Sequence, residues 1–179
     1  MVRRIAIPLL PIALIAAFAL AGCGGGASDS RPDDFAFTFA HSDGSVAPPN
    51  HVEWTVVVDP DGGGRATYTP DYGGENVPVY KAKFTVGDDD LDAIYADMRG
   101  AGLLEQIEPA EDAPIGGDVE TARIYADGET FDVPPFDDSG AAPLAEVSEQ
   151  VRALVPEEDW RSFERRRDDY AQQRYGEQP

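Results

Sequence analysis

Short stretches of alternating apolar and polar residues dominate the first half of this chain. Phe35, Phe37 and Phe39 alternate with Ala36 and Thr38, which is the two-residue period of a β-strand with one aromatic face. Further strand-like stretches cover residues 51–58, 65–69 and 79–86. Because turn-forming residues separate these stretches, the sequence predicts an antiparallel meander of about four strands.

Helical spacing replaces the alternation after residue 87. Asp88 opens a run of three aspartates, which suits the positive end of a helix dipole, and Gly100 follows as a stop signal. Two more helices are predicted near the C-terminus, one ended by Pro156 and one running toward Gly176. The apolar residues that carry the three patterns are Leu91, Ile94, Tyr95 and Met98, then Leu144, Val147, Val151 and Leu154, then Trp160, Phe163 and Tyr170.

A β-hairpin is predicted in the second half of the chain. Residues 119–125 and 130–133 have strand character, and Asp127 with Gly128 between them is a strong turn signal. The sequence therefore predicts a single α+β domain over residues 35–175, in which the meander and the hairpin are covered on one face by two or three helices. A chain of 179 residues has room for one such domain and little room for a second.

The N-terminal segment has the layout of an export signal. Arg3 and Arg4 precede an apolar run over residues 5–20, and small residues follow just before a cysteine. The Leu-Ala-Gly-Cys sequence at positions 20–23 resembles the lipobox of bacterial lipoproteins. The resemblance implies that residues 1–22 are a signal peptide cut between Gly22 and Cys23, and that Cys23 carries a diacylglyceryl thioether with further acylation of its amine.

A plain transmembrane helix is the alternative interpretation of this segment. Residues 5–21 number 17 and include Pro8 and Pro11, whereas a span needs about 20 apolar residues, so the signal peptide is favoured. Residues 23–34 are predicted to be the lipidated cysteine and a flexible tether, because they are rich in glycine and polar residues. The protein is therefore expected outside the cytoplasm, anchored to the cell membrane, or to the outer membrane in a cell with two.

The charge and the cysteine content exclude several classes of function. The formal net charge is −20, and it becomes −22 once Arg3 and Arg4 are removed with the signal. Such a surface repels phosphate backbones and anionic headgroups, so we expect no nucleic-acid binding and membrane contact only through the lipid on Cys23. Cys23 is the only cysteine, which excludes an internal disulfide and a cysteine-based zinc site. No cofactor is predicted.

Only two histidines, His41 and His51, could serve as a general base or a nitrogen ligand. His51 and Glu53 are two residues apart and share one strand face, so together with His41 they could begin a metal site. Neither histidine lies in a recognisable catalytic motif, and polar residues on a solvated strand face are the favoured interpretation. The sequence therefore predicts no catalytic residue and no metal ligand.

An acidic turn resembles the opening of a calcium loop. Asp59, Asp61 and Gly62 have the required spacing, because alternate acids let oxygens converge on one cation. The EF-hand pattern then needs a glutamate at its twelfth position, where this chain has Pro70. An ordinary Asp-Gly turn is therefore favoured over a looser cation site.

The basic residues of the chain gather near its C-terminus. Arg161, Arg165, Arg166 and Arg167 could dock an acidic partner or a lipid headgroup. Acidic residues interleave with them, and helical neighbours of opposite sign usually pair with one another. The favoured prediction is a solvated helix face with paired charges.

Three short features stand out in the body of the chain: a Gly-Ser pair, a double proline and a C-terminal stretch of Val-Pro, Trp and Arg-Arg. They are Gly44 with Ser45, Pro48 with Pro49, and Val155, Pro156, Trp160, Arg166 and Arg167. Through them, much of residues 35–170 resembles small exported lipoproteins of unknown function, and the resemblance implies no activity.

The leading hypothesis is a membrane-tethered, non-enzymatic binding or interaction domain for an unknown protein or small molecule. One alternative is an envelope hydrolase or metal-dependent enzyme that uses His41, His51 and nearby carboxylates. The other is a structural component of the cell envelope.

Overall fold

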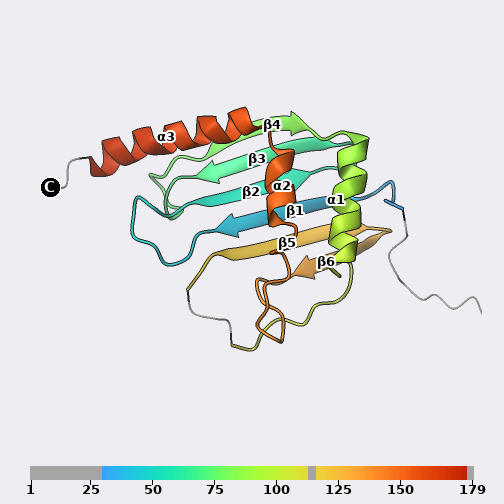
Figure 1. The fold of residues 1–179 in the computed structure, drawn as a ribbon. Coiled ribbons are helices and arrows are strands. Elements are labelled where there is room, and N and C mark those ends of the chain that lie inside the picture. Colours follow the sequence, from blue (N-terminus) through green and yellow to red (C-terminus); the bar gives the residue numbers. More distant parts are fainter. Residues whose placement is uncertain (1–29, 113–115, 177–179) are drawn as a thin grey trace, which may run out of the picture.

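The computed structural model describes residues 30–112 and 116–176, and these residues form six strands and three helices (Figure 1). The strands are β1 (Ala36–Ser42), β2 (Glu53–Val58), β3 (Gly63–Thr69), β4 (Tyr80–Thr85), β5 (Val119–Ala126) and β6 (Glu129–Val133). The helices are α1 (Asp88–Gly100), α2 (Ser148–Leu154) and α3 (Glu157–Tyr175). The predicted signal peptide, Cys23 and most of the predicted tether lie outside the described residues.

The strands of the described part form one antiparallel sheet with the order β4-β3-β2-β1-β5-β6. Strands β1 to β4 follow one another as the predicted meander. The β5–β6 hairpin joins the meander at its first strand, because β5 pairs with the edge of β1 that β2 leaves free. The α+β class predicted from the sequence is confirmed.

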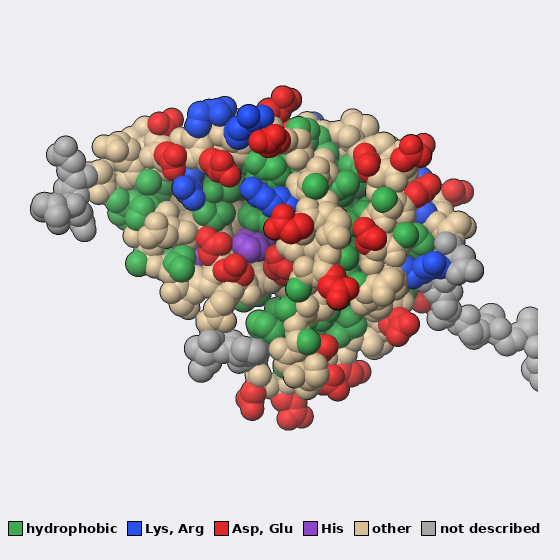
Figure 2. Space-filling view, viewed as in Figure 1, with side chains coloured by type: hydrophobic (Ala, Val, Ile, Leu, Met, Phe, Trp, Pro, Cys, Tyr) green, Lys and Arg blue, Asp and Glu red, His purple; other side chains and the backbone are tan. Residues whose placement is uncertain are grey.

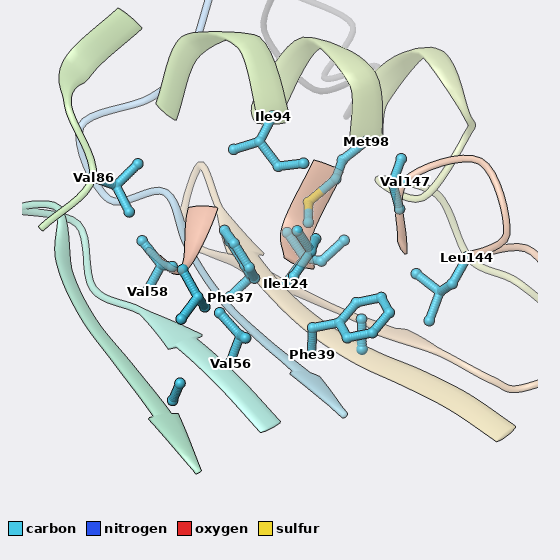
Figure 3. Close-up of a cluster of buried hydrophobic side chains, with 14 of the residues drawn as sticks. Phe37, Phe39, Val56, Val58, Val86, Ile94, Met98, Ile124, Leu144 and Val147 are labelled. Atoms are coloured by element: carbon cyan, nitrogen blue, oxygen red, sulfur yellow. The ribbon is translucent and has the colours of Figure 1, made fainter. Parts of the chain in front are cut away.

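The three helices within the described ranges lie across the same face of the sheet (Figure 1). Figure 3 shows Phe37 and Phe39 of β1 and Ile124 of β5 on the sheet side of the core, with Ile94 and Met98 of α1 above them. Each of these five side chains is at most 2% exposed. Because buried apolar area contributes about 25 cal/mol per Å², this layer is the main source of the domain's stability.

The other face of the sheet carries the polar half of each alternation. Thr38 of β1, Arg65 of β3 and Arg123 of β5 are exposed on this face. Both lysines of the chain, Lys81 and Lys83, are exposed beside them on β4. The period that predicted the strands thus separates a buried aromatic face from an exposed polar face.

The domain begins before residue 35, the boundary predicted from the sequence. Arg31 forms ion pairs with Asp88 and Asp92 of α1 at 3.0 and 2.6 Å, and its side chain is only 15% exposed. The Asp34 carboxylate accepts hydrogen bonds from two backbone N–H groups in the β5–β6 turn. The composition of residues 23–34 predicted a flexible tether. It could not reveal these contacts, because the partners of Arg31 lie 57 and 61 residues further along the chain. The last residues of the predicted tether therefore belong to the domain.

Two tight turns use the residues that the sequence places there. Asp127 and Gly128 have positive φ angles of 54° and 77°, which a type I′ hairpin turn requires, so the predicted hairpin is confirmed. In the turn between β2 and β3, Asp59 forms an ion pair with Arg65, and the Asp61 carboxylate accepts a hydrogen bond from the backbone N–H of Gly63. The two aspartates whose spacing resembles the start of a calcium loop therefore stabilise the turn, as the favoured interpretation of an ordinary turn expects.

Candidate functional site

The two histidines lie on opposite faces of the sheet. His41 follows the buried phenylalanines of β1 on the helix-covered face, and its ring stacks on Trp54 with centroids 5.0 Å apart. His51 lies on the other face, where its ring stacks on Tyr72 at 3.7 Å and its Nε2 is 3.2 Å from Glu53 Oε1. His51 and Glu53 therefore share a face as expected, but the structure does not bring them to His41. The favoured interpretation of a solvated face is wrong for His51, which is only 2% exposed.

Four polar side chains lie close to His41, and together with it we call them the His41 cluster: Asp43, Asp118, Glu120 and Ser148. His41 Nδ1 is 3.1 Å from Glu120 Oε1, and His41 Nε2 is 3.1 Å from Asp43 Oδ1. The Ser148 hydroxyl donates a hydrogen bond to the same Glu120 oxygen. In Figure 2, acidic side chains surround the histidine that is visible on the helix-covered face.

The register of the sheet and the start of α2 assemble this cluster. His41 and Glu120 are paired residues on the neighbouring strands β1 and β5. Ser148 is the first residue of α2, and Asp43 and Asp118 lie just outside the ends of β1 and β5. The cluster therefore forms only when the hairpin pairs with the meander.

The order of the hydrogen bonds indicates which chemistry the cluster suits. A serine nucleophile needs its hydroxyl against a general base such as an imidazole. In this cluster the Ser148 hydroxyl bonds to Glu120, which lies between it and His41. A carboxylate at each ring nitrogen instead favours a cation at this place, either a proton on His41 or a metal ion.

Two opposing effects set the pKa of His41. Burial is the largest single effect, and it lowers the pKa. The hydrogen bonds to Glu120 and Asp43, together with their negative charges, outweigh burial and raise the pKa of His41 above its usual 6.5. His41 therefore holds a proton more tightly in the folded protein than in the unfolded chain.

In metal-free buffer, the contribution of His41 to stability is expected to fall as the pH rises. Because its folded pKa is raised, the contribution is fully present below about pH 6.5 and is lost as the pH passes through the folded value. The measurement is urea unfolding of the wild type and of His41→Gln at several pH values between about 5.5 and 9. The stability difference between the two should shrink toward high pH, and a constant difference would contradict this account.

A cleft of about 340 Å³ opens beside the His41 cluster, and we call it the Trp160 cleft. Its lining residues are Asp43, Val52, Tyr68, Arg152, Trp160, Glu164, Arg167 and Asp168. Trp160 forms one wall: its indole N–H donates to the Arg152 carbonyl oxygen at 2.9 Å, and the Arg152 guanidinium lies 4.5 Å from the ring centroid. Small-molecule sites are concave and combine aromatic side chains with a few polar groups that fix the orientation of the ligand.

The C-terminal arginines are mostly engaged within the domain. Arg161 pairs with Glu157 one helical turn away at 3.5 Å, and Arg167 pairs with Asp168 at 3.1 Å. The guanidinium group of Arg166 lies 3.8 Å from the centroid of the Tyr80 ring instead. The predicted charge pairing along this helix is therefore confirmed for Arg161 and Arg167.

A larger hollow of about 460 Å³ lies at the polar face of the sheet. Its walls include Thr38, Thr121 and Ile107, and its one arginine, Arg123, pairs with Asp132 at 2.6 Å. The Trp160 cleft is smaller, but it brings together more charged and aromatic groups. We therefore take the Trp160 cleft and the His41 cluster as the candidate functional site.

Sequence reasoning considered His41 as a possible base or metal ligand, favoured a solvated polar role for it, and missed its partners. Glu120 lies on the same strand face as the buried Ala122 and Ile124 of β5. A charged residue at a position that the alternation predicts to be buried is a signal that could have singled it out. For Asp118 and Ser148 the local sequence holds no comparable signal.

Neither the protein-family models nor the curated proteins compared with this chain give a match. Among residues 30–112 and 116–176, no helix is both long enough and apolar enough to span a bilayer. The chemistry of the site and the N-terminal sequence are therefore the basis for a functional proposal.

Proposed function

We propose that this chain is a lipid-anchored extracytoplasmic protein whose folded domain binds a small molecule in the Trp160 cleft. Anchoring is supported by the apolar run that ends at Leu-Ala-Gly-Cys in positions 20–23. Binding is supported by one observation: Arg152 and Arg167 converge with the rings of Tyr68 and Trp160 in a single cleft.

The cleft suits a small organic anion. Arg152 lies 3.7 Å from Glu164, and the side chains of Arg152 and Arg167 are 38% and 37% exposed. Pairs that are this open to water contribute little, so an incoming carboxylate or phosphate can replace the protein's own acids at the guanidinium groups. Because Asp43, Glu164 and Asp168 also line the cleft, an anion is expected to bind there only through direct contact with the two guanidinium groups.

A ligand is expected to be retained by the protein released in detergent from its own membranes, where native mass spectrometry would detect it as added mass. Combining Arg152→Gln with Arg167→Gln should lower the bound fraction roughly tenfold or more, because losing a charged hydrogen bond costs about 1.5–3 kcal/mol.

The matched control is Arg165→Gln, which changes an exposed arginine of α3 outside the cleft. It should keep the wild-type added mass, and urea unfolding should show that all variants are folded. If the added mass is lacking in the wild type, or is unchanged in the double variant, binding in this cleft is refuted.

A further inference from the structure

The geometry points to a divalent transition-metal site formed by His41, Asp43 and Asp118, and Zn²⁺ is the ion that fits it best. One potential ligand atom from each of these residues lies within 4.8 Å of the other two. The inference goes beyond the proposed function, because the metal would bind whether or not an organic anion occupies the Trp160 cleft.

The donor atoms match the chemistry of zinc. One imidazole nitrogen and two carboxylate oxygens suit Zn²⁺, whereas Ca²⁺ and Mg²⁺ prefer oxygen ligands only. Ligand atoms of a tetrahedral zinc ion are about 3.4 Å apart, since Zn–N and Zn–O bonds are about 2.0–2.1 Å. His41 Nε2 and Asp43 Oδ1 are already 3.1 Å apart. Asp118 is exposed, so rotation of its side chain can bring its carboxylate to the same ion.

His41 is held in the orientation that a metal ligand needs. Its Nδ1 faces Glu120, so the opposite nitrogen, Nε2, faces Asp43. Glu120 is itself fixed by the Ser148 hydroxyl, and the stacking of the imidazole on Trp54 sets the plane of the ring. A histidine that bonds a carboxylate through one nitrogen and a metal through the other is a recurrent arrangement in zinc proteins. Glu120 and Ser148 are therefore positioning residues.

A close backbone approach keeps the two aspartates together. Gly44 follows Asp43, and its N–H is 3.3 Å from Asp118 Oδ1. A Cβ atom at position 44 would lie 2.4 Å from the carbonyl oxygen of Gly117, which is too close for any side chain. Only glycine at position 44 lets the loop after β1 approach the loop before β5 this closely. This packing is independent of the hydrogen bonds of His41, and it leads to the same site.

The site is also accessible. Asp118 is exposed and Asp43 lines the Trp160 cleft, so an ion and its water ligands can reach the His41 cluster at Asp118 as well as through the cleft. Three protein ligands leave one position of a tetrahedral ion for water or another ligand. The negative charges of Asp43, Asp118 and Glu120 favour a divalent cation over neutral or anionic species.

Zinc binding is tested by isothermal titration of the detergent-solubilised full chain after removal of metals with a chelator. We expect one Zn²⁺ per chain, with Ca²⁺ at the same concentration unable to compete. Asp43→Asn and Asp118→Asn should each weaken binding at least tenfold, whereas Asp112→Asn, a change at an exposed aspartate outside the cluster, should bind like the wild type.

Two further variants test how the site is built. Glu120→Gln should weaken zinc binding roughly 10- to 100-fold, as loss of a carboxylate behind a ligating histidine does. It should also change the visible spectrum of the Co²⁺-loaded protein, which a merely structural role of Glu120 would leave unaltered. Gly44→Ala should weaken binding by separating Asp43 from Asp118.

The inference is overturned if the wild type binds no Zn²⁺, if Ca²⁺ competes equally, or if Asp43→Asn and Asp118→Asn bind like Asp112→Asn. Both aspartate variants change side chains outside the apolar core, so a folding failure of Gly44→Ala would leave the test intact. A wild type that binds no Zn²⁺ but retains the organic ligand would refute this site alone, and a wild type that binds Zn²⁺ but retains no organic ligand would refute only binding in the Trp160 cleft.

Discussion

Replacing Phe39 with alanine is expected to lower the free energy of unfolding by about 3–5 kcal/mol. The Phe39 side chain is fully buried, and its ring stacks on Trp54 with centroids 5.3 Å apart. Because β1 is held by β2 on one side and β5 on the other, the backbone cannot collapse into the space that the ring leaves. Domains are stable by only about 5–15 kcal/mol, so this variant should unfold at a much lower urea concentration.

The control lies on the same strand. Thr38 is the adjacent residue on the exposed face of β1, and Thr38→Ala should cost less than about 1 kcal/mol. Urea unfolding followed by far-ultraviolet circular dichroism measures both variants. Equal losses at the two positions would contradict the assignment of the helix-covered face as the core.

Most of the secondary structure could be predicted because its signals are local. The alternation of Phe35, Phe37 and Phe39 is a property of five consecutive residues, and β1 forms there as Ala36–Ser42. Helix α1 begins at the run of aspartates and ends at Gly100, where the sequence places its start and stop. Burial then selects the apolar phase of each element, so most of the predicted core residues are buried, although Leu154 is only partly buried and Tyr170 lies outside the core.

The attachment of the hairpin to the meander could not be predicted. Nothing in residues 119–133 indicates that β5 pairs with β1 rather than with β4, because both strands offer an edge. The pairing depends on contacts between segments that are distant in sequence, and His41 and Glu120 are 79 residues apart. The sequence therefore predicted the elements of the sheet without their order.

The candidate site follows from that unpredicted pairing. His41 and His51 have similar local surroundings in the sequence, each with a carboxylate two residues further on. Their contacts in the folded protein differ: His41 lies within hydrogen-bond distance of Glu120 on the neighbouring strand, whereas the His51 ring stacks on Tyr72. Loop contacts such as the one at Gly44 leave no periodic signal, so the approach of Asp118 appears only in the folded protein.

Exporting residues 24–179 behind a secretory signal that lacks a lipobox is expected to move nearly all of the protein from the membrane fraction to the soluble extracytoplasmic fraction. A single acyl chain gives only marginal binding at about 0.8 kcal/mol per buried CH2, but the two or three chains proposed on Cys23 would hold firmly. The polypeptide offers no comparable attraction, because the formal charge of −22 without Arg3 and Arg4 repels anionic headgroups.

The full chain supplies the comparison for this experiment. It should stay in the membrane fraction at about 1 M salt, where the Debye length is only about 3 Å, because acyl chains are insensitive to screening. Mass spectrometry should find that residues 1–22 are absent and that Cys23 carries the added mass of its acyl groups. Release by salt would indicate electrostatic adsorption instead, and an intact Met1 with an unmodified thiol would refute the lipid anchor. The proposals for the metal site and the Trp160 cleft concern the folded domain, so they would stand even if the lipid anchor were refuted.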